Sequence, residues 1–223
     1  MKTFICMFGF AVVLLSVNAM AQSIDQRYPA GDIRTLEVKQ DRGNIYITGS
    51  NTDYAHLQVN KVKGGIGCMT KIQNENGVLL IKSAHALFSG FTCEVDVILE
   101  LPRQVPIHAD IGASTLHIKD MSGPIQLSVG AGHVEGTIAS SDTNIKLGAG
   151  RINLGWSEVI KSGKVDISVG AGVVDIKFPR GTVVDQNLTN GFGVLNSKLI
   201  GDSSSHFKVE AKVGFGSISF DYL

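Results

Sequence analysis

A glycine-centred unit of about 20 residues recurs six times in the C-terminal half of this 223-residue chain, and it is the feature that most restricts the fold. Successive units begin 18, 18, 22, 21 and 23 residues apart. In the first unit, Ser114 replaces the second glycine. The glycines of the repeat are Gly112, Gly130, Gly132, Gly148, Gly150, Gly170, Gly172, Gly191, Gly193, Gly214 and Gly216. Self-similarity at a nearly fixed period predicts a stack of similar structural units.

Apolar and polar residues alternate on both sides of each glycine pair, which indicates β-strands with one buried face. The apolar positions that flank a pair, such as Val169 and Val174, are five residues apart. A straight strand would place them on opposite faces, because side chains alternate with a period of two. A bend at the glycines restores a common interior. The residue between the glycines is alanine in four units and phenylalanine in two, and we expect it to pack into the bend.

A unit of this size cannot bury its apolar face alone, whereas stacking the units edge to edge buries a continuous core. We therefore predict an all-β fold, a single β-solenoid of stacked short strands with Gly-x-Gly corners. A closed barrel or a sandwich is the alternative, since regularly spaced short strands suit those folds too. Helix should be nearly absent after the first segment.

The repeat is less regular towards the N-terminus. Leu36, Val38 and Gly43 fit the same frame, and so does the group around Gly77. Extra alternating segments at 56–62 and 93–101 suggest an antiparallel-rich start. We expect residues 22–106 to form this N-terminal β region and residues 107–223 to form the regular repeats, the two being continuous as one domain.

The first 21 residues have the pattern of a cleaved signal peptide. Lys2 precedes an apolar run at 4–17, and Ala19-Met20-Ala21 supplies a small-x-small exit. An N-terminal membrane anchor is the alternative, but a 14-residue helix rises only about 21 Å, less than the roughly 30 Å hydrocarbon core. No later stretch is long and apolar enough to span a bilayer as a helix. We therefore expect an exported protein, in the periplasm, at the cell surface or outside the cell.

Export also suggests how the cysteines are used. Cys6 leaves with the leader, so the mature chain keeps Cys68 and Cys93. An even number of cysteines in an oxidising compartment indicates a disulfide. A soft-metal site that adds Met69 and His85 is the alternative.

The charge of the chain excludes one class of function. Lys plus Arg and Asp plus Glu both number 20, so the formal net charge is zero. A nucleic-acid-binding protein needs a clustered basic surface to displace counterions. We expect no nucleic-acid partner.

The segment from Val95 to Pro102 alternates and ends in Leu-Pro, and His108-Ala109-Asp110-Ile111-Gly112 and the Gly-Ala-Gly units follow it. In this pattern, over roughly residues 31–223, the chain resembles the bacterial DUF4097-type "putative adhesin" domains. The resemblance implies a β-solenoid of an exported or membrane-associated protein. That family has no agreed active site to carry over.

Two groups of side chains are candidate sites. Asp166 and Asp175 are candidate carboxylates for a carbohydrate-active enzyme, but they lie on opposite sides of one corner. His108, Asp110 and His117, with His133 on the next unit, are a candidate metal site that needs convergence across a corner. In both cases a solvated surface is the simpler interpretation. We expect no catalytic residue, no metal and no cofactor.

Trp156 is the one tryptophan of the chain. We expect it to cover an end of the core, with an exposed sugar-stacking residue as the alternative.

The sequence thus predicts a non-enzymatic envelope or surface protein, a scaffold or adhesion-type binding module. Its partner would be an envelope component, protein or glycan. A carbohydrate-active enzyme on a β-helix is the first alternative, and a periplasmic metal-binding protein is the second. The final segment, 217–223, has no obvious polar cap, which leaves self-association through an exposed end open.

Overall fold

The computed structural model describes residues 23–64, 68–85 and 93–223, so the predicted signal peptide lies outside the described residues. The described chain is all-β, with a single 3-10 turn, η1 (Ala30–Asp32), as its helical element. The strands are β1 (Ser23–Pro29), β2 (Thr35–Ser50), β3 (Tyr54–Lys63), β4 (Cys68–Glu75), β5 (Val78–His85), β6 (Glu94–Pro102), β7 (Ile107–Lys119), β8 (Ile125–Ile138), β9 (Asp142–Trp156), β10 (Gly163–Phe178), β11 (Val183–Ser197), β12 (Ile200–Gly201) and β13 (Phe207–Tyr222).

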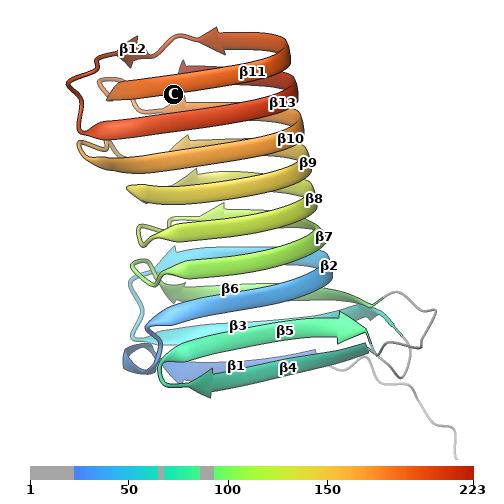
Figure 1. The fold of residues 1–223 in the computed structure, drawn as a ribbon. Helices are drawn as coiled ribbons and strands as arrows, with labels where there is room; N and C mark the ends of the chain where they lie inside the picture. The colour runs from blue at the N-terminus through green and yellow to red at the C-terminus, as the bar shows by residue number, and fades with distance from the viewer. Residues whose placement is uncertain (1–22, 65–67, 86–92) are drawn as a thin grey trace, which may run out of the picture.

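These strands form one large, mostly parallel sheet. Its order is β1-β3-β6-β2-β7-β8-β9-β10-β13-β11-β12, with β5 also paired to β2 and β4 to β5. The pairing is parallel from β6 to β12, whereas β1–β3, β3–β6 and β4–β5 are antiparallel. Figure 1 shows the long strands stacked one above another, with the antiparallel strands at one end. An antiparallel-rich start followed by a regular parallel stack is what the sequence predicts.

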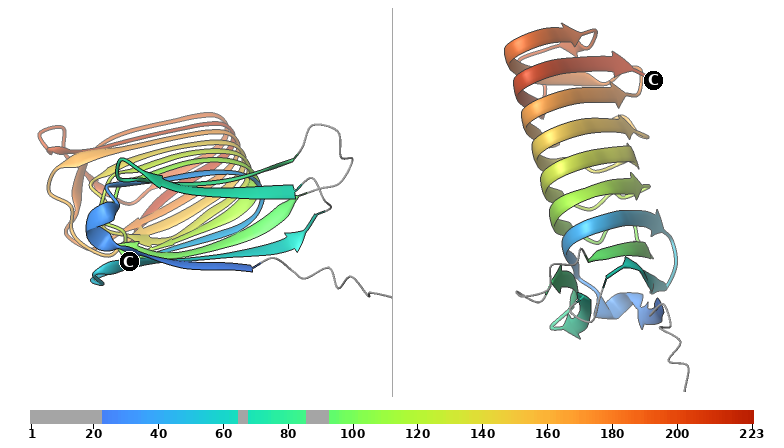
Figure 2. Two further views of the ribbon diagram at one scale, coloured as in Figure 1. Left: turned by 90° about the horizontal axis from the view of Figure 1, so that it is seen from below. Right: turned by 90° about the vertical axis from the view of Figure 1, so that its right-hand side faces the viewer.

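The long strands fold over along their length, as the views in Figure 2 show, and their burial pattern changes phase at the glycine corner. We call the part before the bend the first arm and the part after it the second arm. In β10, Val169 of the first arm and Val174 of the second are both buried. They lie in register with the buried Leu147 and Ile152 of β9. The bend therefore turns two out-of-phase alternations toward one interior, and the core is a continuous column of Val, Ile and Leu between the arms.

Close stacking of the corners explains why they require glycine. At the second glycine of most corners φ is positive, for example +139° at Gly150. A Cβ added there would lie 1.8 Å from the carbonyl oxygen of Gly132 on the neighbouring strand. At such a position, both the backbone angle and the contact with the next strand disfavour a side chain.

The residue between the two glycines points outward and does not pack into the bend, so this expectation was wrong. Phe192 and Phe215 are 71% and 62% exposed, and their rings stack on each other with centroids 5.3 Å apart. The physical reason is that the inner side of the corner is already filled by the flanking apolar positions.

The order of the strands differs from the order of the sequence at the C-terminal end. β13 pairs with β10 on one side and with β11 on the other, so it lies between two strands that precede it in the chain. The final segment, which we expected at an exposed end, is therefore inside the stack. Among the described residues, β11 is the long strand at this end whose outer edge is largely unpaired.

The group around Gly77 also has another role than expected. Asn76 and Gly77, with φ of 52° and 82°, form the tight turn of the β4–β5 hairpin. β5 then pairs in parallel with the first arm of β2. Cys68 of β4 and Cys93, just before β6, form a disulfide with a Cα–Cα distance of 5.2 Å, which leaves no thiolate for the soft-metal alternative.

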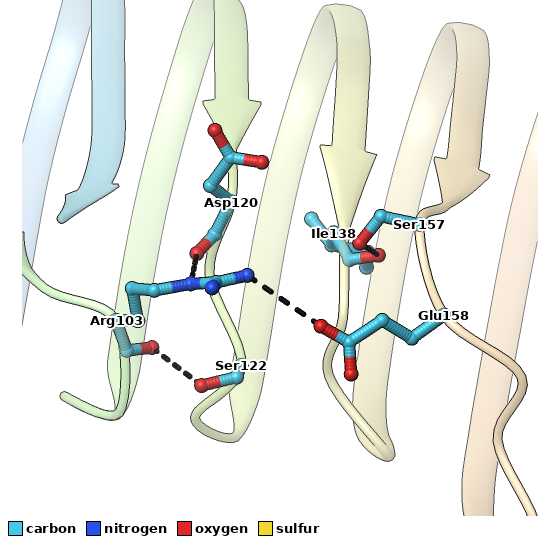
Figure 3. A network of polar contacts seen from close by, with 6 residues as sticks. All are labelled: Arg103, Asp120, Ser122, Ile138, Ser157 and Glu158. Atoms are coloured by element: carbon cyan, nitrogen blue, oxygen red, sulfur yellow. Dashed lines mark hydrogen bonds and ion pairs between the residues drawn. The ribbon is translucent and has the colours of Figure 1, made fainter. Parts of the chain in front are cut away.

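The loops that return from one second arm to the next strand are held by polar contacts (Figure 3). The Arg103 Nε donates to the carbonyl of Asp120 at 2.9 Å, and its guanidinium lies 3.8 Å from the Glu158 carboxylate. The Ser122 hydroxyl donates to the Arg103 carbonyl, and the Ser157 hydroxyl donates to the Ile138 carbonyl. One arginine therefore links the loops before and after β7 to the loop after β9.

Trp156 is fully buried, so its alternative as an exposed sugar-stacking residue is wrong. Its ring packs against Phe178, with centroids 4.7 Å apart, and Phe178 also contacts Phe207 and Phe220. The indole N–H donates to the Ser140 carbonyl at 2.8 Å, which satisfies its one polar group.

Candidate functional site

The outer face of the first arms carries two neighbouring columns of polar side chains. Because the strands pair in register, residues from successive strands lie directly above one another. The first column contains Glu37, His108, Gln126, Asn144, Asp166 and Glu210. The second contains Lys39, Asp110, Ser128, Lys146, Ser168 and Lys212.

These two columns line a shallow surface groove. One hollow of about 370 Å³ extends from Glu37 to Asn144, and a second of about 180 Å³ continues from Asn144 to Glu210. They share Asn144 and Lys146, so we treat them as one feature, the first-arm groove. It crosses β2, β7, β8, β9, β10 and β13 at right angles to the strands.

Several polar side chains in the middle of the first-arm groove are not used in contacts within the protein. Within the described residues, Gln126, Ser128 and Asn144 make no side-chain hydrogen bond to the protein, and Lys146 makes no ion pair. The carboxylates along the groove alternate with lysines, so neither sign of charge dominates. Amide and hydroxyl groups could therefore bind a ligand here by hydrogen bonds, and the surrounding charges do not favour a ligand of either sign.

The outer face of the second arms is different, since its polar side chains bind one another. His117 Nδ1 lies 2.9 Å from the Glu135 carboxylate, and the His117 ring stacks on Tyr46 with centroids 4.6 Å apart. Arg151 contacts the Asp175 carboxylate at 3.4 Å. These cross-strand pairs use the polar groups internally, which makes this face less suited to a ligand.

Hydrogen bonds to charged partners shift the pKa of a few exposed groups. The Asp166 carboxylate beside Lys164, at 2.9 Å, raises the pKa of that ammonium. Lys198 donates to Asp221 and lowers the pKa of its carboxyl, with a further contribution from the Tyr222 amide. In the N-terminal region, the hydrogen bond from His56 lowers the pKa of Asp25. Each shift belongs to a surface pair.

The structure separates the members of the candidate metal site. His108 and Asp110 lie on the first arm of β7, in the first-arm groove, whereas His117 lies on its second arm and pairs with Glu135. His133 stands opposite Thr115 and Arg151 in another column. No cluster of three or more potential ligands occurs among the described residues.

The candidate carboxylates are separated in the same way. Asp166 faces outward from the first arm of β10, and Asp175 faces outward from its second arm. The sequence analysis missed that Asp166 stands next to Glu210, because β13 unexpectedly neighbours β10. Knowledge of the strand order would have been needed to find this pair.

Within the described part of the chain, the model contains no helix that could cross a lipid bilayer. No model of a known protein family matches the sequence, and no curated protein is similar to it.

Solved structures do resemble the fold. A "putative cell adhesion protein" from Clostridium sporogenes is 13% identical, with a TM-score of 0.52, over 92% of this chain and 100% of that one. A "putative adhesin" from Bacteroides fragilis is 15% identical, with a TM-score of 0.30, over 89% of this chain and 97% of that one. A "putative lipid binding protein" from Parabacteroides distasonis is 9% identical, with a TM-score of 0.26, over 90% of this chain and 96% of that one. At this level of identity, the match to the Clostridium protein shows a similar fold and nothing about the ligand.

Proposed function

We propose that this chain is an exported, non-enzymatic β-solenoid of the DUF4097 type, an adhesion-type module that binds an uncharged envelope glycan in its first-arm groove. The observation that carries the proposal is the groove itself, two columns of polar side chains held in register over six strands. The disulfide fits an oxidising compartment, and the fold is similar to that of a protein described as involved in cell adhesion.

The length and chemistry of the groove favour a polymeric glycan. Successive strands are about 4.8 Å apart, so equivalent side chains recur along the groove at intervals close to the length of a sugar unit. The amides of Gln126 and Asn144 and the hydroxyl of Ser128 can each donate or accept hydrogen bonds to sugar hydroxyls. The balance of lysines and carboxylates argues against a strongly charged polymer.

Binding of the mature protein to a panel of neutral and acidic polysaccharides, measured by calorimetry, tests the proposal. We expect a neutral polysaccharide to bind, and Gln126→Ala with Asn144→Ala to weaken binding at least tenfold. The matched control is Thr137→Ala with Asn153→Ala, which removes a hydroxyl and an amide from the second arms of β8 and β9. Absence of binding by every neutral polymer, or equal loss in the control, would refute the proposal.

A carbohydrate-active enzyme remains the second candidate, because Asp166 and Glu210 are neighbours on adjacent strands in the same groove. A retaining glycosidase needs two carboxyl groups about 5 Å apart. The same incubations, followed for new reducing ends, separate the two functions. Sustained release of reducing ends that is lost in Glu210→Gln would identify an enzyme in place of a binding module.

A further inference from the structure

The outermost long strand, β11, has an open edge. β13 covers one side of it over 185–197, whereas on the other side β12 pairs only with Val183 and Val184. From Asp185 to Ser197 the outer edge has no partner strand within the described residues. An unpaired strand edge presents backbone N–H and C=O groups in a row, which is a template for pairing with another chain.

Half of the exposed large apolar side chains of the described residues lie at this end of the molecule. Twelve are exposed in the described part of the chain, and six of them lie on β11, β12 and the adjacent β13. These six are Val183, Phe192, Val194, Leu195, Ile200 and Phe215. A concentration of exposed apolar residues beside an open edge marks an interaction surface.

From Gln186 to Ser197, the inward-facing positions of β11 alternate between polar and apolar residues. The Ser197 hydroxyl donates to the Gln186 side chain at 2.8 Å, which joins the two arms. The Asn190 amide donates to the carbonyls of Val194 and Gly216. Between these polar groups, Leu188 is half-buried and Leu195 is 44% exposed. The end of the core is therefore only partly closed.

We propose that β11 pairs with β11 of a second copy of this chain, antiparallel and about a two-fold axis through the glycine corner, so that each first arm lies against the partner's second arm. This two-fold contact would continue the sheet across two molecules and cover Leu188 and Leu195 of both.

The backbone orientation of β11 fits this pairing. The Val184 carbonyl accepts a hydrogen bond from the Asp202 amide, which follows β12 on the side of β11 away from β13. The even-numbered residues of the first arm therefore direct their backbone N–H and C=O groups to the open edge. The Lys198 amide donates to the Phe220 carbonyl, so the backbone groups of this even-numbered residue face β13. The odd-numbered residues of the second arm therefore direct theirs to the open edge. Placing Leu188 opposite Leu195 therefore joins edge-facing residues on both strands, as an antiparallel hydrogen-bonded pair requires. The same register places Gln186 opposite Ser197.

A second copy fits this edge better than other occupants do. A lipid bilayer would leave the backbone groups of the edge without partners. Head-to-tail stacking would require the other end of the molecule to present a bent strand, but the sheet ends there in β1, a strand of seven residues without a glycine corner. The edge from Asp185 to Ser197 also contains no lysine and no proline, the residues that commonly block strand pairing.

Sedimentation velocity of the mature, disulfide-bonded protein over a range of concentrations tests this inference. We expect a monomer–dimer equilibrium, with no larger species. Leu195→Lys places a charge in the centre of the contact and should raise the dimer dissociation constant at least tenfold. Val159→Lys is the matched control, because Val159 is also 44% exposed but lies in the loop after β9; it should leave the dimer unchanged.

Amide hydrogen exchange is a second test of the dimer that needs no variant. The amides of Gln186, Leu188 and Leu195 should exchange more slowly as the protein concentration rises. A protein that stays monomeric, amide exchange that is independent of concentration, or equal effects of the two lysine variants would overturn the inference. Growth into open-ended polymers would overturn the two-fold arrangement. None of these outcomes depends on whether the first-arm groove binds a glycan.

Discussion

At the residue scale, the corner glycines are the positions where the chain has least freedom of sequence. Their inward neighbours can be Val, Ile or Leu, because the core column tolerates different apolar shapes. The second glycine of most corners combines a positive φ with backbone contact to the next strand, and both conditions disfavour a side chain. The sequence pattern predicts the bend, but the contact between corners follows only from the stacking of the strands.

Gly150→Ala should lower the free energy of unfolding by about 3 kcal/mol or more, since strain and a backbone clash act together. Gly181→Ala is the control, because Gly181 has a φ of +88° but no atom within 4 Å of an added Cβ. It should cost only the backbone strain, about 1–2 kcal/mol. Urea denaturation of both variants makes the comparison, and equal losses would mean that the stacking contact contributes nothing.

The surface pair of Lys198 and Asp221 allows a prediction for titration. Hydrogen bonding lowers the pKa of Asp221, so the ionised carboxylate stabilises the fold above the ordinary Asp value of 3.8. This contribution is lost as the pH falls through the lowered value. Lys198→Ala should raise the pKa of Asp221 toward 3.8, leaving the part due to the Tyr222 amide. An NMR titration of the carboxyl carbon measures this, with Lys146→Ala as a control that should leave the value unchanged.

At the element scale, the unit of construction is the bent strand with its return loop. The sequence predicts each such unit well, because the alternation and the glycines act locally. The sequence also indicates which strand ends the stack. Three inward positions of β11 are polar, whereas the equivalent positions of the neighbouring β13 are apolar: Gln186, Asn190 and Ser197 stand opposite Val209, Val213 and Phe220. Polar residues at core positions are expected in a terminal unit that faces water.

The return loops should depend on Arg103. Arg103→Ala removes a charge-assisted hydrogen bond to the Asp120 carbonyl and should lower the free energy of unfolding by about 1–2 kcal/mol. Glu158→Gln weakens only the longer, exposed ion pair and should cost less than about 0.5 kcal/mol. Denaturant titration compares the two variants; a larger loss in Glu158→Gln would mean that the ion pair, and not the backbone contact, holds the loops.

At the scale of the whole molecule, the all-β parallel stack could be predicted, but the order of its strands could not. From the sequence, either β11 or β13 could be the next neighbour of β10, because both alternate around a Gly-Phe-Gly corner. The choice depends on interactions between distant segments, such as the packing of Phe178 against Phe207 and Phe220. The polar positions of the first-arm groove recur at fixed offsets before the corners, so they can be found in the sequence, but which of them are neighbours depends on the strand order.

The disulfide should contribute to the stability of the antiparallel end. It closes a loop of about 26 residues, which corresponds to about 3.5 kcal/mol from the reduced entropy of the unfolded chain. Cys68→Ser with Cys93→Ser should lower the free energy of unfolding by about that amount. Reductant should produce the same fall in the wild-type protein and none in the double variant. Unchanged stability in both experiments would mean that the bridge is dispensable.

The position of β13 also determines when this protein can finish folding. Its two neighbours, β10 and β11, are synthesised before it, yet they do not pair with each other in the native arrangement. Until residues 207–222 emerge, one side of β10 is unpaired and β11 has only the two-residue β12 as a partner strand. The last turn of the stack must therefore assemble in a single late step, and a nascent chain interrupted before that step would be especially prone to join with its neighbours.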